Sequence, residues 1–234
     1  SDVCSSDLDK RNMYGSDSLG ATFSFYFGHH MSTIEGGMVS TNNSDLYDLM
    51  RMKRCHGMAR ESFKQKDYAA QYKNIEPSFL FVTDGYNFRN HEICAVLGSS
   101  QLKRLDKMIE RRRINYIEYV NLLNRYPTLF YPHLYEDGNS SFCFPFVCKS
   151  EKIAKSMKET FKKYEIEYRP IVSGNLLTQP FLLNRGYKIE TRKVKTNAEI
   201  LHSHGVYIGN NHFVGAKHMH ILGQALEDVY DDIC

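Results

Sequence analysis

The 234-residue sequence lacks the features that mark several large classes of protein. No apolar run approaches the roughly 18 residues that a membrane-spanning helix needs. Residues 1–20 do not carry the basic-then-apolar pattern of a signal peptide. A formal net charge of +3 is too small to indicate nucleic-acid binding, although a site for a small anion remains open. The 42% hydrophobic and 24% charged residues are typical of a soluble globular chain.

Metal and redox motifs are also scarce. The six cysteines include no CxxC pair, which argues against a zinc ribbon or a disulfide framework and favours reduced thiols in the cytoplasm. No HExxH motif occurs, and the pairs His202-x-His204 and His218-x-His220 fall in predicted helix or loop. Side chains two positions apart on a helix point in directions that differ by about 200°. Neither histidine pair would then face one metal ion, so we expect no metal site. A His-rich metal-binding module remains the alternative from a different class.

The first part of the chain predicts short strands followed by a helix. Residues 21–27 and 36–41 have the aromatic and β-branched content of short strands. The segment after them has helical spacing, with Ser44 or Asp45 as its N-cap and Gly57 as its stop.

A strand-like run, FLFV, follows at residues 79–82, and a long helical period then runs from Asn90 to Pro127. Gly98 is a candidate break in that helix. Acidic residues interleave with a basic cluster on it, so we expect a solvated face rather than a nucleic-acid stripe. The cluster comprises Lys103, Arg104, Lys107, Arg111, Arg112 and Arg113.

Beyond Pro127, strand and helix patterns alternate, which predicts a compact α/β or α+β lobe. Strands are expected at 141–147, 165–172 and 206–210, and helices at 152–164, near 197–205 and from about 215. We therefore expect two structural parts, residues 9–112 and 113–234. The octapeptide SDVCSSDL resembles the translation of a sequencing-adapter oligonucleotide, and residues 1–8 are expected to be a non-native segment.

Three polar side chains form a candidate phosphate site, although the sequence has no P-loop and no GxGxxG motif. Ser24 stands at a strand end before a glycine turn, and the segment GYNFRN supplies Asn87 and Arg89. A hydroxyl, an amide and a guanidinium can together hold a phosphate. Each residue alone also fits a helix-start turn or a surface charge.

Four segments, in this order, resemble the DegT/DnrJ/StrS family of sugar-nucleotide aminotransferases. They are FSFYFGHHMSTIEGGMVST, RCHGMAR, DGYNFRNHEICAVLGSSQLKRLDKMIERRR and EYRPIVSGN. The resemblance covers roughly residues 9–234. It implies the α/β fold of the PLP-dependent transferases of fold type I (aspartate aminotransferase-like), with pyridoxal 5'-phosphate or pyridoxamine 5'-phosphate as cofactor. It also implies a homodimer with shared active sites.

Carried over residue by residue, the resemblance makes Ser24 the hydroxyl that holds the cofactor phosphate. Asn87 corresponds to the asparagine that reaches this phosphate across the dimer interface, and Arg89 is its neighbour. His29 stands five residues after Ser24, where the aminotransferases have the lysine that forms a Schiff base with the cofactor. An imidazole cannot form that bond, but it is suited to moving protons at neutral pH. We therefore expect His29 to be catalytic, and His30 is left unassigned.

A histidine at this position is typical of the subgroup that removes the 3-hydroxyl of nucleotide-linked 4-keto-6-deoxy sugars in 3,6-dideoxysugar and lipopolysaccharide O-antigen biosynthesis. The loop GHHMSTIEGG favours GDP-4-keto-6-deoxy-D-mannose as substrate and L-glutamate as amino donor. His56 and Arg169 match positions that line the substrate site. The alternatives are an amine-transferring relative and an iron–sulfur-assisted enzyme that acts on a CDP-sugar. The latter needs a close Cys-x-Cys pair, which the sequence lacks.

In this family the cofactor segment lies near the middle of a chain almost twice as long. We therefore expect the sequence to be the C-terminal part of such an enzyme, with an incomplete large domain and an intact small domain. The aspartate that pairs with the pyridine nitrogen would then precede residue 1, and the fragment alone would be inactive.

Overall fold

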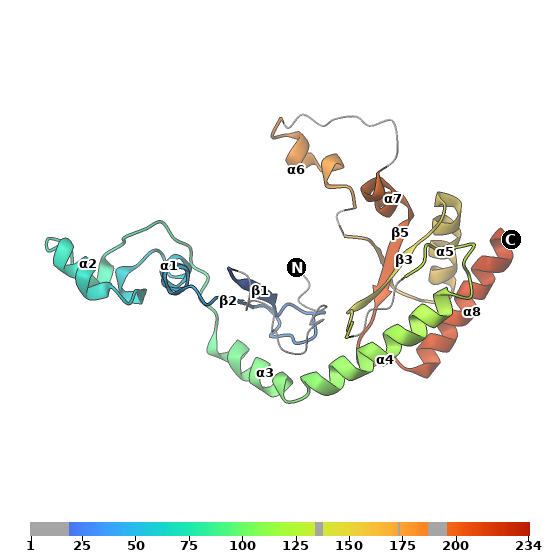
Figure 1. Ribbon diagram of the computed structural model, residues 1–234, viewed down its shortest axis with the longest axis horizontal. Coiled ribbons are helices and arrows are strands. Elements are labelled where there is room, and N and C mark those ends of the chain that lie inside the picture. The colour runs from blue at the N-terminus through green and yellow to red at the C-terminus, as the bar shows by residue number, and fades with distance from the viewer. Residues whose placement is uncertain (1–18, 134–137, 173, 187–195) are drawn as a thin grey trace. The chain divides into compact units, whose positions relative to one another are not determined.

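The computed structural model describes residues 19–133, 138–172, 174–186 and 196–234 (Figure 1). The chain divides into two compact units, Ser1–Leu105 and Asp106–Cys234, and each is described here by itself. The division falls at the start of a long helix, a few residues before the expected boundary between residues 112 and 113. The octapeptide 1–8 lies outside the described residues.

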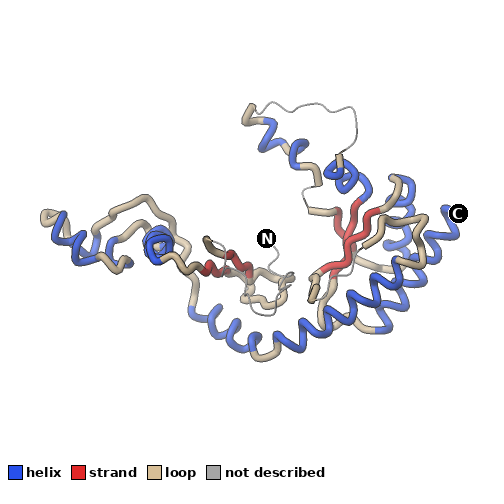
Figure 2. The backbone as a smooth tube through the Cα atoms, viewed as in Figure 1, coloured by secondary structure: helices blue, strands red, loops and turns tan. Residues whose placement is uncertain are grey.

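An antiparallel hairpin opens the described part of the first unit. Strand β1 (Ala21–Ser24) pairs with β2 (Gly37–Ser40), and Ser24 lies opposite Gly37. Both strands lie within the ranges predicted from the sequence. Figure 2 shows the two strands of this hairpin in red. The loop between the strands, residues 25–36, carries both histidines of interest.

Helix α1 (Ser44–Arg54) follows the hairpin as predicted, but its cap differs from the prediction. The N-cap is Asn43, whose side chain accepts a 2.8 Å hydrogen bond from the Leu46 N–H. Ser44 and Asp45 already belong to the first turn, so their assignment as caps is wrong. A second helix, α2 (Gln65–Gln71), occupies a stretch in which the sequence predicts no element.

The apolar run at 79–82 is not a strand. Pro77–Phe79 forms a short 3-10 helix, and Phe81 makes a single isolated bridge to Met58. Leu80 is only 2% exposed, so the run supplies one core side chain rather than a strand face. The prediction is wrong because apolar runs of four residues do not distinguish strand pairing from local burial.

The long helical period is interrupted, although not at Gly98. Helix α3 (Glu92–Leu102) ends before Lys103, and α4 (Leu105–Leu123) begins two residues later. Gly98 lies inside α3 and is buried. A Cβ atom there would approach the Thr33 methyl carbon to 3.3 Å, so the glycine permits close packing rather than a break.

A three-stranded antiparallel sheet forms the centre of the second unit. Its order is β3 (Cys143–Val147), β5 (Gly205–Gly209), β4 (Tyr168–Pro170). The helices with it are α5 (Glu151–Lys163), α7 (Asn197–His204) and α8 (Ala216–Ile233), all near their predicted positions. A short helix, α6 (Pro180–Leu183), lies between the strand and the helix predicted on either side of it, where the sequence predicts no element.

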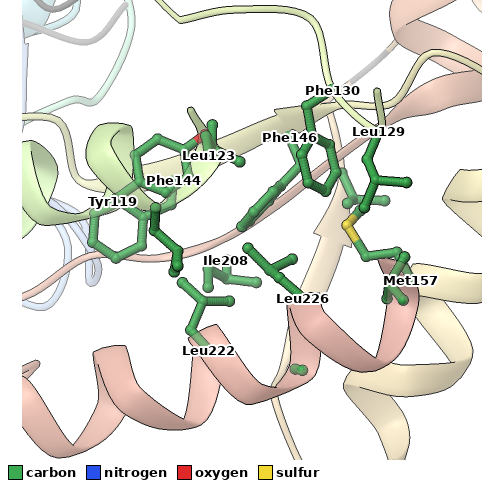
Figure 3. Packing of buried hydrophobic residues seen from close by; sticks show 14 of the residues in the cluster. Tyr119, Leu123, Leu129, Phe130, Phe144, Phe146, Met157, Ile208, Leu222 and Leu226 are labelled. Atoms are coloured by element: carbon green, nitrogen blue, oxygen red, sulfur yellow. The ribbon is translucent and has the colours of Figure 1, made fainter. Parts of the chain in front are cut away.

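The core of the second unit is aromatic. On β3 the alternate residues Phe144 and Phe146 are buried, and Phe144 stacks on Tyr119 of α4 at 4.7 Å. Figure 3 shows Leu222 and Leu226 of α8 pointing toward these rings. Each such side chain contributes roughly 1.5–3 kcal/mol through burial. This core fixes α4 and α8 against the sheet.

One member of the basic cluster departs from the predicted solvated face. Arg112 is 3% exposed, and its guanidinium donates a hydrogen bond to the Asn210 carbonyl. The Asn115 amide donates to the side chain of Asn210 over 3.1 Å. Buried polar groups need such partners, which explains why Arg112 points inward while its neighbours face solvent.

In the described residues, no helix has the length and apolar character required to cross a membrane.

Candidate functional site

His29 lies on a tight turn that follows β1 directly. The His29 N–H donates a 3.2 Å hydrogen bond to the Tyr26 carbonyl, which closes a four-residue turn. Gly28, the third residue of the turn, has φ 104°, a conformation that side chains with a Cβ rarely adopt. The imidazole of His29 is half-buried. The glycine therefore determines the direction in which the chain enters His29.

Ser24, the last residue of β1, lies two residues before the same turn. Its hydroxyl oxygen accepts a 3.4 Å hydrogen bond from the Tyr26 N–H. A hydroxyl that accepts one bond keeps its own O–H for donation, for example to an anion. Ser24 therefore lies just before the turn, at the end of β1, and His29 is the last residue of the turn.

Backbone hydrogen bonds extend the hairpin into the histidine loop. The Phe25 N–H donates to the Gly36 carbonyl over 2.9 Å, and the Thr33 N–H donates to the Phe25 carbonyl over 2.8 Å. A weaker bond of 3.3 Å joins Phe27 to Ile34. The two limbs of the loop, residues 25–27 and 33–36, are therefore held together by backbone hydrogen bonds.

Asn87 and Arg89 lie together on an exposed segment. The Arg89 Nε–H donates a 3.2 Å hydrogen bond to Asn87 Oδ1. This bond uses the carbonyl of the Asn87 side chain, so the groups that remain for a ligand are the amide N–H₂ and the other guanidinium N–H groups. Both kinds of group are donors, which suits an anion.

His56 adjoins this segment at the end of α1. Its N–H donates a 2.8 Å hydrogen bond to the Tyr86 carbonyl, and the preceding residue, Cys55, forms an isolated bridge with Asn87. His56 has φ 60°, in the left-handed region that is uncommon for residues other than glycine. The structure therefore brings His56 next to the Asn87 segment, although the two lie far apart in the sequence.

Arg169 belongs to the second unit, whereas the other five candidate residues belong to the first. It is exposed on β4, and its guanidinium lies 3.2 Å from the Glu167 carboxylate. The hydrogen bond from this ion pair raises the pKa of Arg169 further above its already high usual value. Arg169 therefore presents a permanent positive charge.

The histidine pairs of the second unit fall in helices, as predicted. His202 and His204 lie in α7, and His218 and His220 lie in α8. His202 Nδ1 accepts a 3.4 Å hydrogen bond from the Asn175 N–H, which is a structural contact. Across the described residues, no group of three or more His, Cys, Asp or Glu side chains is arranged to hold a metal ion.

Two residues that the sequence did not single out help to hold the histidine loop (residues 25–36) in place. Thr33 is 3% exposed inside the loop, and Gln101 of α3 hydrogen bonds to Ser32. No local motif marks either residue; the bond between Ser32 and Gln101, for example, joins residues that are 69 positions apart. The only sequence signal is that Gly98 and Gln101 share one face of a helix.

The fold defines the class of protein. The two units have the fold of the aspartate aminotransferase-like, PLP-dependent transferases. The structure described as E. coli GDP-4-keto-6-deoxy-D-mannose-3-dehydratase with bound hydrated PLP matches 93% of this chain and 56% of its own, with a TM-score of 0.79 and 29% identity. Within this class, the chain belongs to the DegT/DnrJ/EryC1/StrS aminotransferase family, whose model matches residues 6–215.

Curated relatives agree with this assignment. The GDP-4-keto-6-deoxy-D-mannose 3-dehydratase of Escherichia coli O55:H7 is 33% identical over 202 residues, which are 84% of this chain and 51% of the relative. The enzyme of the same name from Yersinia pseudotuberculosis is 34% identical over 203 residues, with the same shares. The chain spans about half the length of these relatives. The predicted family and fold class are therefore confirmed.

Proposed function

We propose that the protein containing this chain removes the 3-hydroxyl of a nucleotide-linked 4-keto-6-deoxy sugar, with pyridoxal or pyridoxamine 5'-phosphate as cofactor. The observation that carries this proposal is the histidine at position 29, on the turn that follows the strand ending at Ser24. Two relatives named as GDP-4-keto-6-deoxy-D-mannose 3-dehydratases support the GDP-sugar as substrate. A structure of such an enzyme with a trapped PLP-glutamate geminal diamine supports L-glutamate as amino donor.

The donor groups of the first unit fit a phosphorylated cofactor. The Ser24 hydroxyl, the Asn87 amide N–H₂ and the Arg89 guanidinium are all groups that can donate hydrogen bonds, and phosphate oxygens accept such bonds. We assign Ser24 to the site of its own chain and Asn87 with Arg89 to the site of a second copy. His56 and Arg169 are assigned to the nucleotide-sugar substrate.

His29 is the proposed proton carrier. When bound, the cofactor supplies an amine that captures the sugar ketone and a conjugated ring that accepts electrons. The imidazole of His29 would take up, at one ring nitrogen, the proton released from the carbon that bears the cofactor's amine, and would return a proton to the departing 3-hydroxyl, which leaves as water. A lysine at this position would hold the cofactor covalently, whereas His29 leaves it held by its phosphate and ring contacts.

The electron balance of the proposed reaction requires the amino donor. Replacing the 3-hydroxyl by hydrogen reduces the sugar by two electrons. L-Glutamate supplies these electrons, because it is oxidised to 2-oxoglutarate and its nitrogen leaves as ammonia. One glutamate is therefore consumed for each sugar, and no nitrogen remains on the product.

A homodimer with shared sites is part of the proposal. Successive β2 residues face opposite sides of the hairpin, and both Met38 (46%) and Val39 (47%) are exposed. The first unit also exposes the aromatic rings of Phe27 and Phe88. Exposed apolar surface of this kind marks contact sites with other polypeptides.

The cytoplasmic location stays a prediction.

Product analysis tests the reaction. The protein, expressed from its complete reading frame, is incubated with PLP, L-glutamate and GDP-4-keto-6-deoxy-D-mannose. Mass spectrometry should detect a 3-deoxy-4-keto sugar nucleotide, with ammonia and 2-oxoglutarate in equal amounts. A product that keeps its 3-hydroxyl and gains an amine would instead establish an aminotransferase. An unchanged sugar and cofactor would contradict both activities.

The variant His29→Lys tests the residue. We expect dehydration to be lost and the cofactor to become covalently attached, which borohydride reduction followed by peptide mapping detects. His220→Lys, which makes the same change at an exposed position of α8, serves as the control and should behave like the unaltered protein. Full dehydration by His29→Lys would remove His29 from the mechanism.

A further inference from the structure

The histidine loop is anchored to α3 through the backbone of Ser32. The Ser32 N–H donates a 2.9 Å hydrogen bond to Gln101 Oε1, and Gln101 Nε2 donates to the Ser32 carbonyl. One side-chain amide therefore satisfies both peptide groups of a single residue. Such a two-point contact determines the orientation of the backbone as well as its position.

Thr33 makes the second contact with the same face of α3. It is 3% exposed, and its hydroxyl donates a 2.7 Å hydrogen bond to the Glu35 carbonyl. Gly98 lies three residues before Gln101, on the same side of the helix. A Cβ atom at Gly98 would lie 3.3 Å from Thr33 Cγ2, closer than most such contacts. The absence of a side chain at Gly98 thus allows the loop to pack closely on α3.

The anchor lies close to His29 along the chain. Only His30 and Met31 separate His29 from Ser32. The other limb of the loop is tied to the same place, because the Thr33 N–H donates to the Phe25 carbonyl. A displacement of residues 32–33 would therefore move both limbs and the turn between them.

We propose that Gln101 is a positioning residue for His29, with Gly98 providing the space in which the loop packs. Proton transfer needs donor and acceptor within about 2.6–3.2 Å, and small displacements of a catalytic group lower the rate strongly. Gln101 would act through the backbone of Ser32 and not through contact with substrate or cofactor. The importance of Gln101 for turnover rests on the proposed function of His29, whereas its effect on the position of the ring does not.

The first experiment replaces Gln101 by Leu in the full protein. We expect kcat to fall on the order of ten- to a hundredfold, with KM for the sugar nucleotide changed less than about threefold. Gln71→Leu, the same change at an exposed residue of α2, is the matched control. Unaltered kcat in Gln101→Leu, in a protein whose His29→Asn variant is inactive, would overturn the proposal and leave the proposed function standing.

A second pair of variants tests the packing. Gly98→Ala should lower kcat because the new methyl group crowds Thr33 Cγ2. Adding Thr33→Ser removes that carbon but keeps the hydroxyl that bonds to Glu35, so the double variant should recover most of the activity. A double variant as slow as Gly98→Ala would contradict the packing argument.

An NMR measurement tests the effect of Gln101 on the position of His29 independently of the reaction. The ring signals of His29, assigned by their loss in His29→Asn, should shift in Gln101→Leu and stay in place in Gln71→Leu. This readout needs no turnover, so it decides the positioning role even if product analysis overturns the dehydratase. Unmoved His29 signals in Gln101→Leu would refute the positioning role.

Discussion

The carboxylate of Asp48 accepts a 2.6 Å hydrogen bond from the hydroxyl of Ser62. It also accepts a 2.8 Å bond from the Phe63 N–H, and Asp48 is only 5% exposed. Asp48 lies in α1, so these bonds join the helix to the segment that follows it. One buried side chain thus fixes the local structure beyond the end of α1.

Replacing Asp48 by Asn should destabilise the first unit by about 1–3 kcal/mol, because each carboxylate oxygen accepts one hydrogen bond and one of the two oxygens would become an N–H₂ group. The free energy of opening is measured by hydrogen exchange of the α1 amides. Asp45→Asn, in the same helix but exposed, is the matched control and should cause a smaller change. Equal effects of the two substitutions would show that the buried hydrogen bonds do not matter.

Gly28→Ala should strain the histidine turn. No atom lies within 4 Å of the position of the new Cβ, so the cost comes from the backbone, whose φ is 104°. We expect a loss of about 1–2 kcal/mol in the free energy of unfolding. Gly209→Ala, which also enters open space but at an ordinary φ, is the control. Equal unfolding midpoints in urea for both variants would contradict the strain argument.

The aromatic core of the second unit should be sensitive to truncation. Phe161 is 0% exposed, and its ring lies 5.6 Å from that of Phe146. Phe161→Ala should cost about 3–5 kcal/mol, through lost burial and the cavity left behind. Phe213→Ala, at a ring that is 78% exposed, should change the unfolding free energy by less than about 0.5 kcal/mol. Similar shifts in the urea midpoint would argue against the core as described.

His133 should make the second unit less stable in mild acid. Burial lowers the pKa of His133 below its usual value of 6.5, and a backbone hydrogen bond with Pro145 opposes this shift. The unfolded chain then binds a proton more readily than the folded chain, so stability is lost as pH falls below about 6.5. The ring lies edge-on to Tyr119 at 5.8 Å.

The variant His133→Gln should therefore lose less stability than the unaltered protein between about pH 6.5 and 5, as measured by urea unfolding midpoints. His220→Gln, at an exposed position of the same unit, is the control for loss of a histidine. The same pH dependence in all three proteins would exclude a contribution from His133.

Regular periodicity made the second unit predictable. Strand β3 and helices α5 and α8 have alternating or helical apolar patterns that extend over enough residues to be recognised. Short elements such as α6 have only four residues and no pattern of their own. The buried position of Arg112 depends on Asn210, almost a hundred residues away, so no local pattern reveals it.

The candidate site was predictable only in part, because most of its residues were identified through resemblance. The step from Ser24 to His29 is local, and the turn observed there agrees with it. Two other contacts join segments that are distant in the sequence: the hydrogen bond between His56 and Tyr86, and the one between Ser32 and Gln101. Contacts of this kind follow from the packing of α1 and α3, which one sequence does not specify.

The strand order β3-β5-β4 has a consequence for how the chain acquires its structure during synthesis. The central strand, β5, is the last of the three to leave the ribosome, and β3 and β4 each pair with β5 rather than with each other. A nascent chain that ends before Gly205 therefore has two strands without a partner. Until Gly205–Gly209 emerges, the edges of β3 and β4 are exposed to pairing with other chains.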